Sequence, residues 1–284
     1  MKVLFCTDGS RISFNSLKNF SKWVNDCEVD VITIIDWSFL PDNILVEADG
    51  FAISCANMAD DILAFSKLEV ESYGLKFGES FKLCGSVVEA ILEQAQKKDY
   101  DLIILGSHGK KGLQKWLGSV SREISYGEHL STYVSKNETL AERILFATDG
   151  SESAKHAIDK AFELFDLKDK QVFICTVNES PETLFLDGKM DTNWILEIER
   201  QQQLYSQETL INLQKVFEDK GIKVQGSAVL TGYPSQKIID FAEHHSIDLI
   251  VSGSRNKNKM KDFLLGSVSK RILENAKCDV VIFK

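Results

Sequence analysis

The chain contains its own sequence twice, and this duplication restricts the fold more than any other feature. KVLFCTDGS at Lys2–Ser10 returns as RILFATDGS at Arg143–Ser151. Two further segments return in the same way. DYDLIILGSHG at 99–109 returns as SIDLIVSGSRN at 246–256, and LGSVS at 117–121 returns as LGSVS at 265–269. The offsets of the three repeats lie between 141 and 148 positions. A unit of this length is too long for a solenoid repeat, so the sequence predicts two similar domains.

Length and composition agree with two globular domains. The 284 residues are about twice the usual domain length of roughly 150. Hydrophobic residues make up 44% of the chain, which is enough for a core in each half. The polar segment SKNETLAER at Ser135–Arg143 stands before an apolar run, as a linker does. We therefore predict an α/β protein with domains at 1–136 and 142–284.

Each copy alternates short apolar runs with longer segments of helical periodicity, the pattern of βαβ units. Right-handed crossovers then give an open five-stranded parallel sheet with helices on both faces. Ligands of such sheets bind beyond the carboxyl ends of the strands. The expected strands are 3–7, 29–36, 81–84, 101–105 and 130–134 in the first copy, and 144–148, 171–177, 223–230, 248–252 and 279–283 in the second.

The charge balance and the cysteine pattern narrow the function classes. With 33 basic and 42 acidic residues the net charge is −9, which argues against a nucleic-acid or membrane partner. No apolar run approaches the roughly 18 residues that cross a bilayer, and MKVLFCTDGS leads directly into a strand, so we expect a cytoplasmic protein. The six cysteines form no Cys-x-x-Cys motif and lie apart from the histidines, which argues against a metal or redox centre.

Glycine-rich turns follow the fourth expected strand of both copies. Gly106-Ser107-His108-Gly109 is followed after eight residues by Gly118-Ser119-Val120-Ser121, and Gly253-Ser254-Arg255-Asn256 is followed after nine by Gly266-Ser267-Val268-Ser269. A glycine turn lets main-chain amides approach a phosphate, and a Gly-Ser at a helix start adds free amides, a hydroxyl and the positive end of the helix dipole. The two loops therefore predict an anion-binding edge in each copy.

An Asp-Gly-Ser follows the first strand of each copy, at Asp8 and Asp149, and completes the same edge. An alternative is that these aspartates do no more than cap the helices that follow them. Basic residues near the glycine turns would attract a polyphosphate, or else form an ordinary solvated surface. They are Lys110, Lys111, Lys115 and Arg122 in the first copy, and Arg255, Lys257, Lys259, Lys261, Lys270 and Arg271 in the second.

These motifs resemble the universal stress protein family in its tandem form. The resemblance rests on strand-Asp-Gly-Ser, on Gly-x2-Gly-x9-Gly-Ser/Thr and on the five-strand alternation, and it covers nearly all of both halves. It implies two domains of the adenine-nucleotide α-hydrolase-like, Rossmann-like type, which pack as a pseudo-dimer through their last strands. In that family, members with the glycine motif bind ATP and members without it do not.

The resemblance also implies roles for particular residues. Asp8 and Asp149 would lie beside the ribose or a phosphate-bound Mg²⁺, and Ile35 and Val177 would lie against adenine. The phosphates of ATP or AMP would be held by Gly106, His108, Gly109, Gly118, Ser119, Val120 and Ser121 in the first copy, and by Gly150, Ser151, Gly253, Arg255, Asn256, Gly266, Ser267, Val268 and Ser269 in the second.

Each copy departs from the family motif. In the first, the spacer Lys110–Leu117 is one residue short, which would rotate or separate the two phosphate contacts. In the second, Asn256 replaces the second glycine, and asparagine tolerates a left-handed backbone at a cost of about 1 kcal/mol or less. That cost is up to about tenfold in affinity, so we expect the second copy to be the better binding half.

Two functions remain open at this point. The first is an ATP- or AMP-binding regulatory protein of the stress response, with an unidentified protein partner, and the second is an interaction module whose sites are degenerate. A PP-loop ligase would need Ser-Gly-Gly-x-Asp-Ser after the first strand, where this chain has Thr-Asp-Gly-Ser. With no Walker motif, nucleophile elbow or evident general base, we expect no catalytic residues and at most slow ATP hydrolysis. The sequence leaves a homodimer open.

Overall fold

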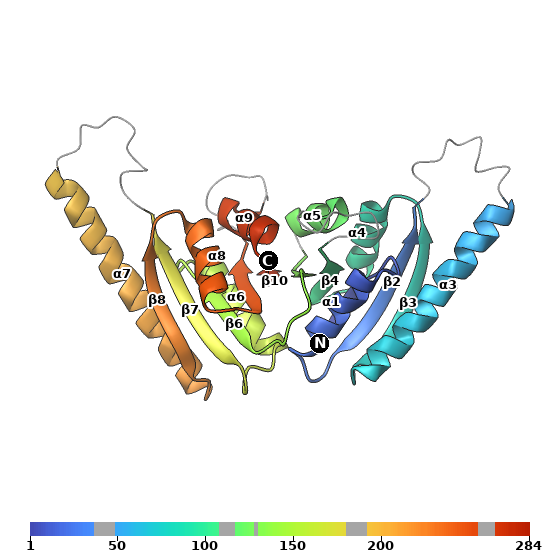
Figure 1. Cartoon of the computed structure of the whole chain (residues 1–284), viewed down its shortest axis with the longest axis horizontal. Coiled ribbons are helices and arrows are strands. Elements are labelled where there is room, and N and C mark those ends of the chain that lie inside the picture. The colour runs from blue at the N-terminus through green and yellow to red at the C-terminus, as the bar shows by residue number, and fades with distance from the viewer. Residues whose placement is uncertain (37–48, 108–116, 128–129, 180–191, 255–264) are drawn as a thin grey trace. The chain divides into compact units, whose positions relative to one another are not determined.

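The computed structural model describes residues 1–36, 49–107, 117–127, 130–179, 192–254 and 265–284. The chain divides into two compact units, Met1–Glu138 and Thr139–Lys284, with the boundary inside the polar segment 135–143. Each unit by itself is an open sheet of five parallel strands covered by helices (Figure 1). The expected packing of the units through their last strands stays a prediction. Among the described helices, none combines the length and the apolar character that crossing a bilayer requires.

The first unit orders its strands β3-β2-β1-β4-β5, and its printed strand pairs are all parallel. Helix α1 packs beside α3, and α4 packs beside α5. In chain order the elements are β1 (Lys2–Cys6), α1 (Arg11–Ser21), β2 (Glu28–Ile35), α3 (Asp49–Ser72), β3 (Lys76–Cys84), α4 (Val87–Lys97), β4 (Leu102–Gly106), α5 (Ser119–Tyr126) and β5 (Thr132–Ser135).

The second unit repeats this arrangement with the order β10-β9-β6-β7-β8, again parallel. Its elements are β6 (Arg143–Ala147), α6 (Glu152–Leu164), β7 (Gln171–Asn178), α7 (Thr192–Asp219), β8 (Val224–Thr231), α8 (Pro234–His244), β9 (Leu249–Gly253), α9 (Ser267–Asn275) and β10 (Asp279–Phe283). The two units therefore have the same fold, as the duplication predicts.

The ten predicted strands are all present. The interior strands β1 and β4 are almost entirely buried because helices cover both of their faces, and their near-continuous apolar runs reflect this. Strand β3 begins five residues earlier than predicted, at Lys76 rather than at Phe81. Its first half, KFGES, lacks an apolar run because it lies at the edge of the sheet, where side chains and backbone face water.

Local signals fix where the helices begin and end. Ser10 caps α1 by accepting a hydrogen bond from the Ser13 amide at 3.2 Å. The long helices α3 and α7 end just before Gly74 and Gly221, whose φ angles of 75° and 73° lie in the left-handed region that glycine adopts without strain. A glycine thus marks the end of each long helix.

Candidate functional site

Strand register brings the Asp-Gly-Ser turn and the glycine turn of each unit to one edge. In the second unit Phe146 of β6 pairs with Val251 of β9, so the two strands reach their carboxyl ends side by side. The first unit repeats this with Phe5 of β1 beside Ile104 of β4. Each unit therefore assembles two of its predicted binding segments at one edge. The segments of the two copies occupy equivalent places, although 141 to 148 residues separate them in the sequence.

The Asp-Gly-Ser segments form the same turn in both units. The Asp149 carboxylate accepts a hydrogen bond from the Ser151 amide at 2.9 Å, and Gly150 has a φ of 75°. Ser151 then caps α6 by accepting from the Ala154 amide at 3.3 Å. Asp8 accepts from the Ser10 amide at 3.0 Å in the equivalent turn. Both aspartates thus have a local structural role in ordering the turn, and both side chains remain exposed.

The start of α9 offers main-chain donors that have no partner within the helix. Gly266 occupies the N-cap position and provides no side-chain hydrogen bond, so the first amides of the helix have no partner within it. The Ser269 hydroxyl lies 3.0 Å from that of Ser252 and donates to the Gly253 carbonyl at 2.7 Å. These contacts attach the first turn of α9 to the carboxyl end of β9, so the start of the helix lies at the carboxyl ends of the strands.

Gly253 is required by close packing between β9 and α6. A Cβ atom at this position would lie 2.5 Å from the carbonyl oxygen of Ser153, well inside contact distance. The Ser153 hydroxyl in turn donates a hydrogen bond to the Ser254 carbonyl. The missing Cβ of Gly253 thus admits the backbone of the neighbouring helix, and its predicted contact with a phosphate stays a prediction.

The second unit has a cavity of about 500 Å³ at this edge. Its wall combines the acidic turn, the start of α9 and an apolar side formed by Val177, Ile238 and Ala147. Gly150 does not line it, and Arg255 and Asn256 lie outside the described residues. The predicted residues that line it are Asp149, Ser151, Val177, Gly253, Gly266, Ser267, Val268 and Ser269.

The corresponding cavity of the first unit measures about 190 Å³. Gly118 and Ser119 do not line it, and Ile34 lines it in place of the predicted Ile35. Successive strand side chains point to opposite faces, so a shift of one residue turns the side chain away from the cavity. His108 and Gly109 lie outside the described residues. The predicted residues that line it are Asp8, Gly106, Val120 and Ser121.

Three substitutions between the copies account for the smaller first cavity. The strand registers make Leu105 equivalent to Ser252, and in the same way Cys6 is equivalent to Ala147 and Ile34 to Val177. In every pair the first unit carries the larger side chain, and all three line its cavity. Among the described residues, the first unit therefore places larger side chains where the second unit has smaller ones.

Sequence reasoning missed Ser252 and Ile238, which also line the second cavity. Comparison of the two copies could have found Ser252, because a serine stands there in an otherwise apolar strand where the first copy has Leu105. Cys6 lines the first cavity, but burial raises the pKa of its thiol far above the usual value, so it is not a thiolate nucleophile.

The basic residues predicted near the loops lie mostly outside the described residues, and Arg122, Lys270 and Arg271 are the members that the structure places. Lys270 and Arg271 are exposed on the first turns of α9. Within the described ranges, no group of three or more His, Cys, Asp or Glu side chains could hold a metal ion.

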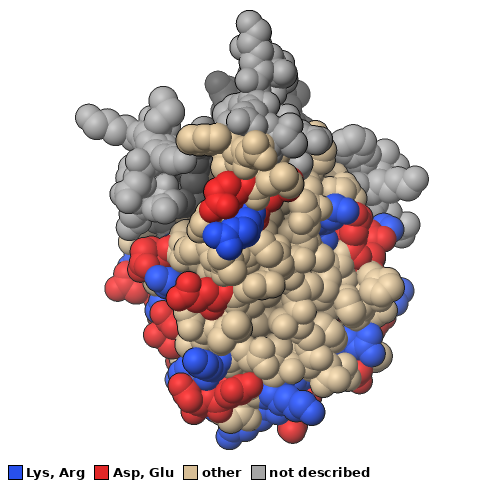
Figure 2. All heavy atoms as spheres, turned by 90° about the vertical axis from the view of Figure 1, so that its left-hand side faces the viewer, with Lys and Arg blue, Asp and Glu red and all other residues tan. Residues whose placement is uncertain are grey.

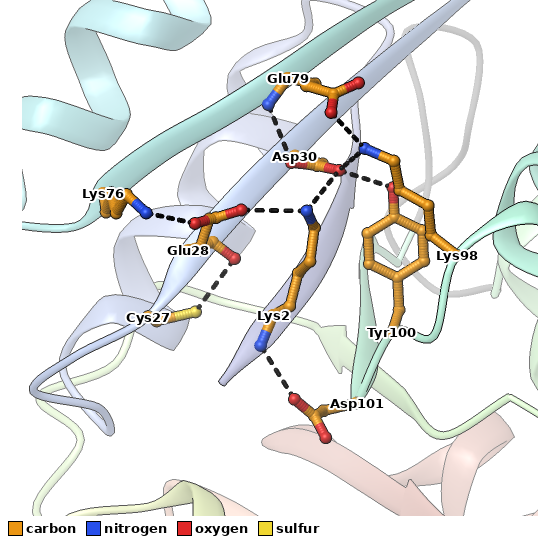
Figure 3. Close-up of polar contacts among 9 residues, drawn as sticks. All are labelled: Lys2, Cys27, Glu28, Asp30, Lys76, Glu79, Lys98, Tyr100 and Asp101. Atoms are coloured by element: carbon orange, nitrogen blue, oxygen red, sulfur yellow. Dashed lines mark hydrogen bonds and ion pairs between the residues drawn. The ribbon is translucent and has the colours of Figure 1, made fainter.

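A second polar cluster, which the sequence did not indicate, lies around Asp30 in the first unit (Figure 3). The Asp30 side chain is completely buried on β2 and pairs with Lys98 at 2.9 Å and Lys2 at 3.4 Å. Its carboxylate also accepts hydrogen bonds from the Tyr100 hydroxyl and the Glu79 amide, each at 2.8 Å.

The contacts of Asp30 keep its carboxyl ionised. Burial by itself would raise the pKa, but the Glu79 amide, Lys98 and Tyr100 outweigh burial and hold the pKa below its ordinary value. The equivalent residue of the second unit is Phe173, which packs against His245 with ring centroids 5.2 Å apart. The cluster is thus specific to the first unit, and within the described part of the chain none of its members lines either cavity.

Comparisons with known proteins identify relatives of both halves. The profile of the Universal stress protein family matches residues 1–126 and 141–284. Universal stress protein MJ0531 of Methanocaldococcus jannaschii is 35% identical over 161 residues, covering 55% of this chain and 89% of the relative. Stress response protein NhaX of Bacillus subtilis is 28% identical over 170 residues, covering 51% of this chain and 98% of the relative.

A solved structure shares the complete two-unit chain. The crystal structure of a universal stress protein from Archaeoglobus fulgidus covers 100% of this chain and 98% of its own, with a TM-score of 0.71 and 22% sequence identity. At this identity the likeness concerns the fold. It agrees with the duplication, since relatives such as MJ0531 and NhaX match about half of the chain and this structure matches all of it.

Proposed function

The chain belongs to the universal stress protein family in both of its halves, and on this premise we propose that its second unit binds ATP or AMP to regulate the protein's part in the stress response. The cavity of about 500 Å³ beside the uncapped start of α9 carries this proposal. Small-molecule sites measure roughly 300 to 1,000 Å³, so the second cavity falls in this range and the first, at about 190 Å³, falls below it.

The chemistry of the second cavity suits a nucleotide. The free amides at the start of α9 and the exposed Ser267 hydroxyl supply donors for phosphate oxygens, and the helix dipole favours their negative charge. The apolar side at Val177 and Ile238 is the surface for a base. Main-chain donors and one apolar wall are thus present within one cavity.

Two carboxylates, Asp149 and Glu179, also line the cavity. They would repel a bare polyphosphate, because like charges at close range disfavour binding. A Mg²⁺ ion carried by the phosphates offsets this repulsion, and Asp149 is the residue that we propose to face it. AMP carries less charge and needs the ion less, so Mg²⁺ should strengthen ATP binding more than AMP binding.

Titration calorimetry of the full chain tests the proposal, with Mg-ATP, ADP and AMP as ligands. We expect one nucleotide per chain. The φ and ψ angles of Gly266 (−55° and 147°) and Gly118 (−59° and 153°) are accessible to any residue, so arginine can replace either without backbone strain. Gly266→Arg should weaken binding at least about 100-fold by blocking the start of α9, and Gly118→Arg, its matched control in the first unit, should leave it unchanged.

Two outcomes would overturn the proposal. Absence of heat with all three nucleotides would leave an interaction module with degenerate sites. Loss of binding in Gly118→Arg with retention in Gly266→Arg would place the site in the first unit. We further propose that any ATP hydrolysis is slower than about one turnover per second, because the Asp149 carboxylate is already engaged by the Ser151 amide of its own turn.

A further inference from the structure

Strand β8 is an edge strand whose protection against pairing is confined to its start, where its register with β7 shifts between Val172 and Phe173. Among the described strands it pairs with β7 alone, so the outward N–H and C=O groups of its other side are open. Val224–Thr231 contains no charged residue and no proline. From Gly226 to Thr231 its register with β7 is unbroken. Such an uncharged, regular edge is a template for a further strand.

The first unit provides an internal comparison, because β3 occupies the same place in its sheet. Strand β3 carries Glu79 and Lys82 along its edge, where β8 has Gly226 and Val229. Lys76 at the start of β3 has an exposed counterpart in Lys223, just before β8. Charged side chains of this kind prevent edge-to-edge association. One chain therefore places charge along the middle of one of its two equivalent edges and leaves the middle of the other uncharged.

Helix α7, which packs over β7 and β8, continues the same surface. Between Arg200 and Lys215 its sequence has one charged residue, Glu208. Its sheet-facing side buries Leu210 and Phe217, while Leu204, Tyr205 and Ile211 are about half exposed on other sides. Figure 2 looks onto this side of the second unit and shows a wide area without charged side chains, with acidic and basic groups gathered at its margins.

We propose that α7 and β8 form a homodimer interface, in which β8 pairs antiparallel with β8 of a second copy and α7 packs against its counterpart. Two reasons favour a second copy over another partner. A two-fold axis places the same strand edge of both copies side by side and antiparallel. The N–H and C=O groups of each edge then form hydrogen bonds with the same groups of the other. The chain also carries a net charge of −9, so two copies repel each other except through a face from which charge is missing.

The size of the surface sets the strength of the dimer. Eight residues of strand span about 26 Å, and a sheet edge with its covering helix is roughly 20 Å deep, so each copy contributes about 500 Å². The total of about 1,000 Å² is at the lower limit for a specific interface. We therefore expect a reversible dimer with a dissociation constant in the micromolar range.

Sedimentation of the full chain from about 1 to 200 µM tests the proposal, with a dimer mass of about 64 kDa as twice 31.9 kDa. The double variant Ser227→Lys and Ile211→Lys places charge on the exposed strand edge and on the exposed helix face. It should raise the dissociation constant at least about 100-fold, to a monomer over the whole range. Hydrogen exchange should show β8 amides that become protected as the wild-type concentration rises.

The duplication supplies a matched control. Ser80 and Ala64 occupy the equivalent positions of the first unit, and both are exposed. The helix equivalence follows from the glycine turns, because Ile62 lies against Gly9 as Thr209 lies against Gly150. The variant Ser80→Lys and Ala64→Lys should dimerise as the wild type does, and circular dichroism should show native melting for both double variants. A wild type that is monomeric at about 200 µM would refute the proposal, as would a dimer that persists in the Ser227 and Ile211 variant or that the control variant dissociates.

Discussion

Replacement of Asp30 by asparagine should lower the free energy of unfolding of the first unit and leave that of the second unit unchanged. The change keeps the shape of the side chain and an acceptor for the Glu79 amide, which now donates at 2.8 Å. It removes the negative charge that compensates Lys98 at 2.9 Å and Lys2 at 3.4 Å. The surroundings allow little relaxation, because a Cβ atom on Gly78 would already collide with the Asp30 carboxylate.

The expected loss of stability follows from the exposure of the partners. Breaking a fully buried ion pair costs about 3 to 5 kcal/mol, but the Lys98 and Lys2 side chains are 25% and 31% exposed and can turn toward water. We therefore expect the free energy of unfolding of the first unit to fall by about 2 to 3 kcal/mol, or its melting temperature to fall by roughly 10 °C. The second unit should not change, because Phe173 stands there.

The stability difference between the wild type and Asp30→Asn should depend on pH in a definite direction. Folding lowers the pKa of Asp30, so its stabilisation is complete above the unfolded pKa of about 3.9 and is lost as the pH falls through the lower folded value. Wild type and Asp30→Asn should therefore differ equally at pH 7 and pH 5.5 and converge below about pH 4.

Urea unfolding followed by circular dichroism measures the free-energy difference, and hydrogen exchange of β2 assigns it to the first unit. Asp60→Asn is the control, because Asp60 pairs with Lys82 at the surface with 58% of its side chain exposed, and it should cost less than about 0.5 kcal/mol. A loss below about 1 kcal/mol for Asp30→Asn at pH 7, or a difference that does not shrink in acid, would refute the electrostatic account.

Two further predictions concern the cavities. The triple variant Cys6→Ala, Ile34→Val and Leu105→Ser should enlarge the first cavity toward the size of the second and add nucleotide binding there. Calorimetry in a Gly266→Arg background measures the added binding. An unchanged cavity in a crystal structure of the variant would contradict this prediction. Gly253→Ala should lower the stability of the second unit by about 1 to 3 kcal/mol, because its Cβ would lie 2.5 Å from a backbone oxygen of α6; urea unfolding that shifts by less than about 0.5 kcal/mol would contradict the packing account.

The fold could be predicted from the sequence because its signals are local. The apolar runs of β1 and β4 reflect strands buried on both faces, and Gly74 and Gly221 mark helix ends because few other residues adopt a positive φ. The start of β3 was missed because an edge strand is half solvated and its polar residues resemble a loop. The burial of Asp30 could not be predicted from the sequence, because its lysine and tyrosine partners come from distant segments of the chain.

By itself, the sequence determined that two equivalent α/β units place acidic and glycine-rich turns at one strand edge, because the motifs recur in both copies at strand ends. Tertiary structure alone decided which side chains share the space at that edge. It placed Ile34 rather than Ile35 in the wall of the first cavity and packed Gly253 against the backbone of α6. It also made the second cavity larger than the first. The reason is that cavity volume depends on strand register and on side chains from separate elements, which periodicity along one chain does not encode.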